Sequence, residues 1–184
     1  ALQQNYDQDI IDAYRNQLIN LSYRIIQDRK ELVRSLSGKA GRYYMELFGE
    51  EKKSFSLKYK TSCPLDDDEE SYIKASLALF EQNKSVENIR KVTALGPHRD
   101  DLSGSLSGNP ISTYGSQGEN RIASLSLKLA VLDPLSEKLG IRPLLLLDDI
   151  TSDLDEKRCR NLLSAINKDN LQVFVTGTKI PEEF

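Results

Sequence analysis

Two adjacent carboxylates, Asp148 and Asp149, directly follow four leucines at residues 144–147. A continuous apolar run indicates a strand that is covered on both faces, and ligands of such sheets lie at the carboxyl ends of the strands. Carboxylate oxygens at that position are suited to a magnesium ion that is bound to phosphate. An ordinary strand end with acidic loop residues would give the same pattern, so the run alone leaves both interpretations open.

Ser116 and Gly118 form a second candidate site upstream of this run. Apolar residues recur three and four positions apart directly after them, which predicts an amphipathic helix that begins near Ser116. These apolar residues are Ile122, Leu125, Leu129 and Leu132. A serine at a helix start caps unpaired backbone N–H groups, and those groups together with the helix dipole attract anions such as phosphate. A helix cap without any anion would need the same residues, so this element also has two interpretations.

The order of these elements resembles the C-terminal part of ABC-type ATPases, and most closely the RecF family of DNA replication and repair proteins. The resemblance is carried by residues 96–102 (GPHRDDL), 114–121 (YGSQGENR), 144–158 (LLLLDDITSDLDEKR) and 172–178 (QVFVTGT). It implies an α/β fold, namely the C-terminal part of an ABC-type P-loop ATPase head with a mainly helical N-terminal arm or subdomain. We expect residues 1–90 to form the arm and residues 91–184 to form the ATPase part, with signature, Walker B and D-loop.

The resemblance implies that four consecutive residues take the positions of the ABC signature motif. These are Ser116, Gln117, Gly118 and Glu119. In that class of ATPase the signature contacts the γ-phosphate of ATP held by the partner subunit. Glu119 and Asn120 stand where glutamines are usual in the RecF family, so the signature departs from the family pattern at these two positions.

The resemblance also implies roles for the residues at the strand ends. Asp148 corresponds to the Walker B aspartate that binds Mg²⁺ through water, and Asp149 to the carboxylate that polarises the attacking water. Residues 152–155 correspond to the D-loop along the dimer interface, with Asp155 as a nucleotide-site residue. Thr176 stands where other ABC ATPases keep a switch histidine, so sensing of the γ-phosphate would use a hydroxyl.

The 184 residues contain no Gly-x-x-x-x-Gly-Lys-Ser/Thr sequence. Because such a P-loop holds the β- and γ-phosphates, we expect this polypeptide by itself to bind ATP weakly and to lack ATPase activity. We therefore expect a fragment of a longer protein whose N-terminal part carries the P-loop and whose cofactors are ATP and Mg²⁺. The first residue, Ala1, is not a methionine, in keeping with this expectation.

For the complete protein, the resemblance implies an ATP-dependent DNA-binding protein of recombinational repair. It would form an ATP-gated homodimer on gapped DNA or single-strand/double-strand junctions, hydrolyse ATP slowly, and act with RecR- and RecO-type recombination mediators. The alternative is a protein-interaction module that docks those mediators and in which the ATPase motifs are vestigial. DNA-binding assays that separate residues 1–90 from residues 91–184 would discriminate the two.

Composition predicts a globular protein of the cytoplasm. The 25 basic and 28 acidic residues give a net charge of −3, which argues against binding nucleic acid through an overall positive field. We expect no membrane association, because no apolar run approaches the roughly 20 residues that cross a bilayer. Cys63 and Cys159 lack metal-ligand spacing and are expected to be thiols in a reducing compartment.

The first half of the chain predicts helices around a short strand. Seven residues form one apolar stripe that we expect to lie in the core: Ile10, Ile11, Tyr14, Leu18, Leu21, Ile25 and Ile26. A break is expected at residues 37–38, a half-buried strand near Phe55, and another helix after the acidic residues 66–70. Residues 96–101 are expected to form a loop that presents His98 and Arg99 either to nucleotide or DNA, or as a structural charged turn.

Overall fold

The computed structural model describes residues 8–49, 53–149, 154–168 and 171–177. It has two compact units: the first contains Ala1–Val33 and Tyr59–Leu102, and the second contains Arg34–Lys58 and Ser103–Phe184. The expected division into an arm (1–90) and an ATPase part (91–184) stays a prediction. The boundaries of the two compact units differ from that division, because residues 34–58 belong to the unit that contains most of the second half of the sequence.

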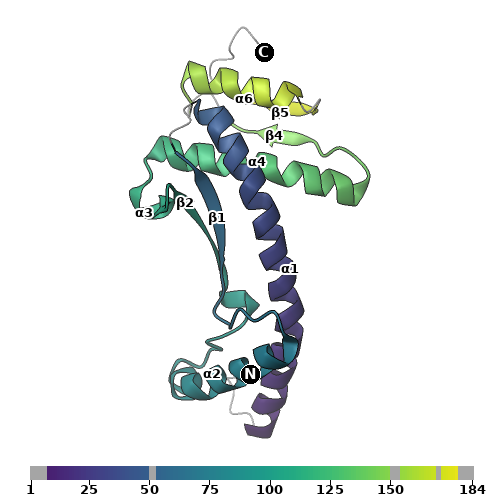
Figure 1. Ribbon diagram of the computed structural model, residues 1–184, viewed down its shortest axis with the longest axis vertical. Coiled ribbons are helices and arrows are strands. Elements are labelled where there is room, and N and C mark those ends of the chain that lie inside the picture. The colour runs from purple at the N-terminus through teal and green to yellow at the C-terminus, as the bar shows by residue number, and fades with distance from the viewer. Residues whose placement is uncertain (1–7, 50–52, 150–153, 169–170, 178–184) are drawn as a thin grey trace. The chain divides into compact units, whose positions relative to one another are not determined.

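Helix α1 (Gln8–Phe48) contributes residues to both units (Figure 1). The expected break at residues 37–38 was wrong, since the helix continues for 41 residues. A glycine inside a helix costs only about 1 kcal/mol relative to alanine, and the buried side chains of Ala40, Tyr44 and Leu47 beyond Gly38 offset that cost. The helix ends at Gly49, whose φ of 72° is left-handed and whose N–H donates to the Met45 carbonyl at 2.9 Å.

The first unit packs the N-terminal part of α1 against α2 (Glu69–Arg90). Asp68 caps α2 by accepting a hydrogen bond from the Ser71 N–H at 2.8 Å, so the helix expected after the acidic residues is confirmed. The core consists of Ile19, Ile26, Cys63, Tyr72, Phe80 and Leu95. Beside it, the side chain of Glu87 is fully buried and pairs with Arg15 at 2.9 Å, which ties the two helices together.

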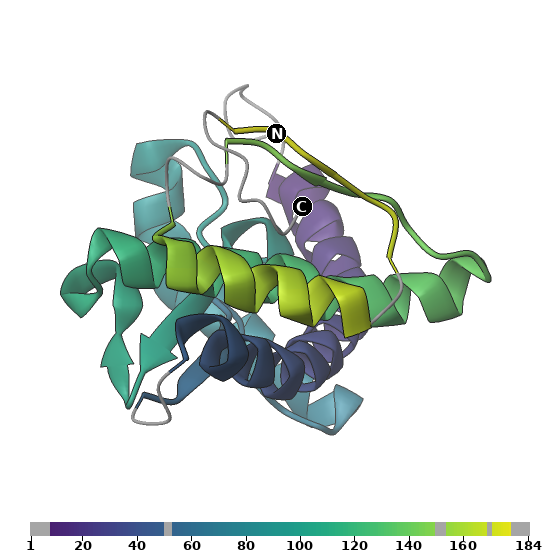
Figure 2. The same cartoon turned by 90° about the horizontal axis from the view of Figure 1, so that it is seen from above.

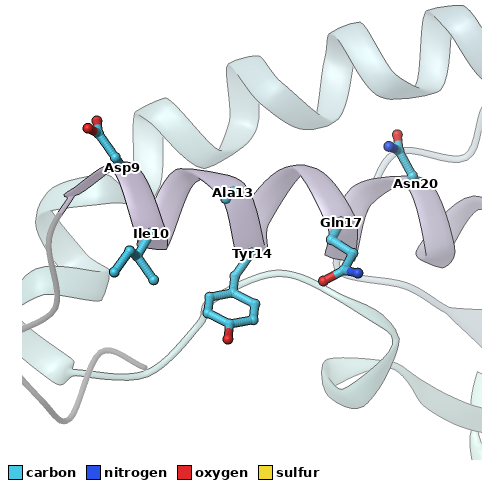
Figure 3. A pocket seen from close by; sticks show the side chains of 6 residues that line it. All are labelled: Asp9, Ile10, Ala13, Tyr14, Gln17 and Asn20. Atoms are coloured by element: carbon cyan, nitrogen blue, oxygen red, sulfur yellow. The ribbon is translucent and has the colours of Figure 1, made fainter.

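The apolar stripe expected in the core was wrong for four of its residues. Ile10, Tyr14, Leu21 and Ile25 are between 41% and 63% exposed. Figure 3 shows the side chains of Ile10 and Tyr14 along α1 in a shallow pocket on this helix. Residues at helical spacing share a face whether or not that face is covered, and here the covered face contains Ile26 from the stripe and Ile19, which lies outside it.

A three-stranded sheet joins β1 (Phe55–Lys60), β2 (Asp101–Leu106) and β3 (Asn109–Pro110) in that order. The strand expected near Phe55 is confirmed. Strands β2 and β3 are antiparallel, with Leu106 paired to Asn109. Ser107 and Gly108 between them both have positive φ, of 48° and 86°, as the tightest hairpin turn requires.

The second unit continues through α3 (Ile111–Tyr114), α4 (Gln117–Leu139), β4 (Leu145–Leu147), α6 (Glu156–Lys168) and β5 (Val173–Val175). Strands β4 and β5 are parallel, with Leu146 paired to Phe174. In Figures 1 and 2, α4 and α6 run in one direction and the two strands run back against them. The N-termini of both helices and the carboxyl ends of both strands therefore lie at the same end of this unit.

The leucine run is not buried on both faces in this chain, so that expectation was wrong. Leu145 and Leu147 are buried in the core of the second unit, whereas Leu144, Leu146 and Phe174 are 46%, 67% and 55% exposed. One face of the two-stranded sheet packs in the core, and the other carries these large apolar side chains in solvent. In the described part of the chain, no helix is both long and apolar enough to span a membrane.

Candidate functional site

Asp148, Asp149 and Thr176 lie together where the two parallel strands end. The Thr176 N–H donates to the Leu147 carbonyl at 2.9 Å, which extends the ladder by one residue and sets Thr176 beside the end of β4. Its hydroxyl donates a hydrogen bond to Asp148 Oδ1 and accepts one from the Asp149 N–H at 2.9 Å. One hydroxyl therefore fixes the side chain of the first aspartate and the backbone of the second.

The backbone at Asp149 is left-handed, with a φ of 49°. Non-glycine residues adopt this region rarely, although aspartate tolerates it better than most, and such conformations cost on the order of 1–3 kcal/mol and cluster at functional sites. The turn takes the chain away from the strand direction directly after Asp148. The next residues, 150–153, include D-loop positions 152 and 153 and lie outside the described residues.

Ser116 caps helix α4 through a reciprocal capping box with Glu119. Ser116 Oγ accepts a hydrogen bond from the Glu119 N–H at 3.3 Å, and Glu119 Oε2 accepts one from the Ser116 N–H at 2.8 Å. Asn120 Nδ2 donates to the carbonyls of Gly115 and Ser116, at 3.1 and 3.0 Å. The predicted helix start at Ser116 is confirmed, and the side chains of Ser116 and Gln117 are exposed in front of it.

Glu119 points into the protein rather than toward solvent. It is 7% exposed, and its Oε1 is bound by Lys53 Nζ. The Lys53 hydrogen bond, followed by the Ser116 N–H bond, lowers the pKa of Glu119 to about 2. The carboxylate is therefore ionised at neutral pH and acts as a support for the loop beneath the exposed Ser116.

Gly115 and Gly118 differ in the space around them. A Cβ on Gly115 would lie 2.5 Å from the carbonyl oxygen of Ile111, so only glycine fits there without a shift of the backbone. A Cβ on Gly118 would meet only Arg158 Nη1, at an ordinary contact distance of 3.6 Å. The loop therefore needs glycine at 115 for its shape, while Gly118 leaves an open surface beside a guanidinium.

Arg158 brings the signature positions and Asp155 together. Asp155 Oδ1 accepts a hydrogen bond from the Arg158 N–H at 2.8 Å and thereby caps α6, while Asp155 Oδ2 pairs with Arg158 Nη1 at 3.0 Å. The same guanidinium lies over the ring of Phe48, 4.8 Å from its centroid, and next to Gly118. One cation thus connects the end of α1 with the starts of α4 and α6.

Residues 96–101 belong to the first unit, and the expected loop was wrong in part, because Pro97–Arg99 form the short 3₁₀ helix η1 and Asp101 begins β2. Arg99 Nε donates to the Thr93 carbonyl at 2.9 Å. Asp100, with 1% of its side chain exposed, accepts hydrogen bonds from the Tyr59 hydroxyl and from the Ser62 N–H at 3.0 Å, and lies 3.7 Å from Arg29. Burial and the bond to Asp100 raise the pKa of Tyr59 to about 12. The sequence singled out His98 and Arg99, whereas the contacts of Asp100 hold this segment in place.

The structure adds Lys53 and Arg158 to the residues expected from the sequence. Arg158 had a signal, because it stands three positions after Asp155 at the spacing of a helical ion pair. Lys53 had none, since it contacts Glu119 from 66 positions away. The described residues contain no group of three or more His, Cys, Asp or Glu side chains that could hold a metal ion without other ligands.

Comparison with curated proteins finds sequence similarity along almost the whole chain. The DNA replication and repair protein RecF of Symbiobacterium thermophilum is 37% identical over 179 residues, which are 96% of this chain and 47% of that protein. RecF of Trichlorobacter lovleyi is 37% identical over 181 residues, which are 98% of this chain and 48% of that protein. The similarity thus includes the first half of the chain, which contains none of the four segments that carried the resemblance. No protein-family model matches the chain.

Comparison with solved structures gives the same result. The recombination mediator protein RecF with ATP, from the RecFOR pathway, superposes with a TM-score of 0.80 at 26% identity. The match covers 98% of this chain and 48% of that structure. A second structure of that mediator, described as RecF-ATPrS, gives a TM-score of 0.79 and covers 47% of its chain. The fold expected from the resemblance to the RecF family is confirmed.

The chain spans about half the length of the curated relatives it matches. Within that span, sequence and fold are similar to the same family, and the candidate residues Ser116, Asp148, Asp155 and Thr176 lie at helix starts and strand ends of the second unit. By these similarities, the chain resembles the RecF family of DNA replication and repair proteins over about half the length of its curated members.

Proposed function

We propose that this chain supplies the signature and Walker B part of a RecF-type ATPase that acts in DNA repair. The observation that carries the proposal is the group of Asp148, Asp149 and Thr176 at the strand ends of a unit whose two helix N-termini lie at the same end. The carboxyl ends of parallel strands and the N-termini of helices are where nucleotides bind in α/β folds. The solved relative with ATP supports the choice of nucleotide.

Asp148 fits the role of a magnesium ligand in such a site. Its carboxylate is exposed, its orientation is fixed by the Thr176 hydroxyl, and carboxylate oxygens are the protein ligands that Mg²⁺ prefers. The described residues contain no group of three or more acidic, His or Cys side chains that could hold a metal ion, so the ion would be held largely by phosphate oxygens and water. When bound, Mg²⁺ neutralises the charge that develops on the phosphates. Asp149 would then polarise the attacking water.

Ser116, Gln117 and Gly118 would contact the γ-phosphate of ATP held by a partner subunit. Ser116 and Gln117 are exposed at the N-terminus of α4, where the helix dipole favours an anion. Asp155 would lie beside this contact through Arg158, and Thr176 would sense the γ-phosphate through its hydroxyl. ATP would thereby stabilise the dimer more than the separate subunits, and hydrolysis would remove that stabilisation.

The P-loop of this ATPase would come from outside the 184 residues. The exposed face of the β4–β5 sheet supports this part of the proposal, because Leu146 and Phe174 lie side by side in solvent. Exposed apolar groups of this kind mark surfaces that another element covers. A P-loop strand paired at an edge of this sheet, with its helix packed on the exposed face, would complete both the sheet and the phosphate site.

The whole protein would form an ATP-gated homodimer on gapped or junction DNA in the cytoplasm, and would hydrolyse ATP slowly. RecO- and RecR-type mediators would be its protein partners. The description of the solved relative as a recombination mediator of the RecFOR pathway supports this context.

ATP-dependent dimerisation tests the proposal. Light scattering with Mg²⁺ and ATP would be measured on this chain alone and on a protein of the full length of its relatives that contains it. We expect only the full-length protein to dimerise. Asp149→Asn should abolish its ATP hydrolysis, whereas the control Asp133→Asn on α4 should leave it unchanged. Unchanged hydrolysis in Asp149→Asn would contradict the proposed role of this carboxylate.

The alternative of a mediator-docking module is favoured by one observation, the exposed apolar residues on α1. Leu21 is 63% exposed and Ile25 is 41% exposed on the same face. Replacing both by serine in the full-length protein should reduce binding of the RecO- and RecR-type mediators if this face docks them. ATP-dependent dimerisation that survives the same substitutions would assign the two functions to separate surfaces.

A further inference from the structure

Lys53 contacts the signature positions from outside the motif. It stands two residues before β1, and its Nζ binds Glu119 Oε1 at the start of α4. The lysine side chain is 51% exposed, whereas the glutamate side chain is 9% exposed. An exposed cation therefore neutralises a nearly buried carboxylate.

Glu119 uses its two oxygens for two different partners. Oε1 binds Lys53, and Oε2 accepts the hydrogen bond from the Ser116 N–H at 2.8 Å. Ser116 Oγ in turn accepts from the Glu119 N–H at 3.3 Å. The chain of contacts from Lys53 through Glu119 ends on the backbone of the residue whose hydroxyl is proposed to meet phosphate.

The charge of Glu119 makes this chain of contacts depend on Lys53. A carboxylate that is taken out of water is costly unless a cation compensates it, and an ionised carboxylate is a stronger acceptor than a neutral carboxyl group. Without Lys53, Glu119 would either stay ionised and uncompensated or take up a proton. In the first case the costly charge turns toward water and the hydrogen bond that fixes Ser116 is broken, and in the second the neutral carboxyl group accepts that hydrogen bond more weakly.

We propose that Lys53 is a positioning residue of the signature: it holds the Glu119 carboxylate so that Ser116 and the first N–H groups of α4 keep the arrangement that receives phosphate. This inference rests on the proposed function for its effect on ATP. The geometric part, that Lys53 fixes the Ser116 backbone, can be tested without ATP.

The fold of the unit does not depend on this contact. Helix α4 packs in the core through Ile122, Leu129 and Ala130, which are at most 1% exposed. Loss of Lys53 should therefore loosen the first turn of α4 and leave the rest of the helix in place. A purely structural lysine would instead change global stability without a particular effect at Ser116.

Four variants of the full-length protein distinguish a lysine that positions Ser116 from a lysine that only contributes to global stability. Lys53→Met removes the cation, and Lys53→Arg keeps it. Glu119→Gln keeps the capping box, since glutamine serves at that position as well as glutamate, but leaves no charge that needs Lys53. Lys58→Met is the matched control, because Lys58 is an exposed lysine on the nearby strand β1.

Amide hydrogen exchange at Ser116 is the first readout. Lys53→Met should speed exchange of the Ser116 N–H about tenfold, the size expected when a charge-assisted hydrogen bond at a partly exposed site is lost. Lys53→Arg and Lys58→Met should stay within about twofold of the unmodified protein. Unchanged exchange in Lys53→Met would overturn the inference whatever ATP does.

The ATP concentration that gives half-maximal dimerisation is the second readout. It should rise about tenfold in Lys53→Met, and in the Glu119→Gln background the same lysine substitution should change it less than about twofold. An equal effect in both backgrounds would mean that Lys53 does not act through Glu119. If the unmodified protein fails to dimerise with ATP, the proposed function fails, and the exchange measurement still decides whether Lys53 positions Ser116.

Discussion

The Thr176 hydroxyl donates a hydrogen bond to Asp148 Oδ1 across the ends of two parallel strands. The two residues are 28 positions apart, and the same hydroxyl accepts the Asp149 N–H. A single threonine therefore holds the side chain of Asp148 and the backbone of Asp149, the two residues for which magnesium binding and polarisation of water are proposed.

Thr176→Val should separate the hydroxyl from the shape of the side chain. Valine fills the same volume but neither donates to Asp148 nor accepts from Asp149, so we expect a stability loss of about 1–2 kcal/mol. ATP hydrolysis by the full-length protein should fall at least about tenfold. Thermal unfolding and steady-state hydrolysis measure the two effects. Thr176→Ser should retain both properties, and equal hydrolysis in the valine and serine variants would show that the hydroxyl is dispensable.

Asp149→Gly should make the protein more stable and less active. Glycine adopts the left-handed conformation at this position without strain, so unfolding should require about 1 kcal/mol more. Hydrolysis should be lost, because the carboxylate is gone. Denaturant unfolding of Asp149→Gly and Asp149→Ala provides the comparison, since alanine removes the same carboxylate but keeps the strain. Equal stability of the two variants would mean that the turn relaxes without glycine.

Gly115→Ala and Gly118→Ala should fail in different ways. The new methyl group at 115 would meet the Ile111 carbonyl at 2.5 Å, so we expect a stability loss of about 2 kcal/mol. At 118 the methyl group meets only Arg158 Nη1, at 3.6 Å, so the fold should stay intact while the phosphate-facing surface is obstructed. The melting temperature should fall in Gly115→Ala and stay unchanged in Gly118→Ala. ATP-dependent dimerisation should weaken in Gly118→Ala although that variant is stably folded. A stable Gly115→Ala protein would contradict the close approach to Ile111.

Acid should weaken the start of α4 through Glu119. Lys53 and the Ser116 N–H lower the pKa of Glu119 from its ordinary 4.5 to about 2. A lowered pKa stabilises the folded state above pH 4.5, and this contribution is lost as the pH falls from 4.5 toward about 2. Because Lys53 is half exposed and solvent screens the pair, the contribution should be about 1 kcal/mol.

Denaturant unfolding at a series of pH values measures this contribution. The difference in stability between the unmodified protein and Glu119→Gln should shrink across that pH window. A difference that stays constant from neutral pH to pH 3 would contradict the lowered pKa.

Sequence patterns predicted the parts of the site that depend on local structure. The cap at Ser116 and the helix after the acidic residues follow from hydrogen bonds within one turn, which the residue types specify. The pairing of Thr176 with Asp148 needed the parallel register of β4 and β5, which only the resemblance to a family suggested. Lys53 could not be predicted, because its contact with Glu119 arises from tertiary packing alone.

Burial was predicted less well than secondary structure. Periodicity identifies which residues share a face, but it does not tell whether another element covers that face. Leu146 illustrates the point: an unbroken leucine run predicted two covered faces, and in this chain one face is open. Ile25 on α1 is exposed for the same reason, while Ile26 beside it is fully buried.

Arg158 pairs with Asp155 and lies next to Gly118, and we expect this arrangement to couple the two nucleotide sites of the proposed dimer. In the proposed dimer, each subunit would report on two nucleotides: its signature would face the ATP of the partner, and its own strand-end carboxylates would face the ATP that it binds itself. Because the Arg158 guanidinium lies between Gly118 and Asp155, ATP binding at one site would change the affinity for ATP at the other. The two ATP molecules would then be bound and hydrolysed as a pair, with a Hill coefficient above one, and replacing Arg158 would make the two sites independent.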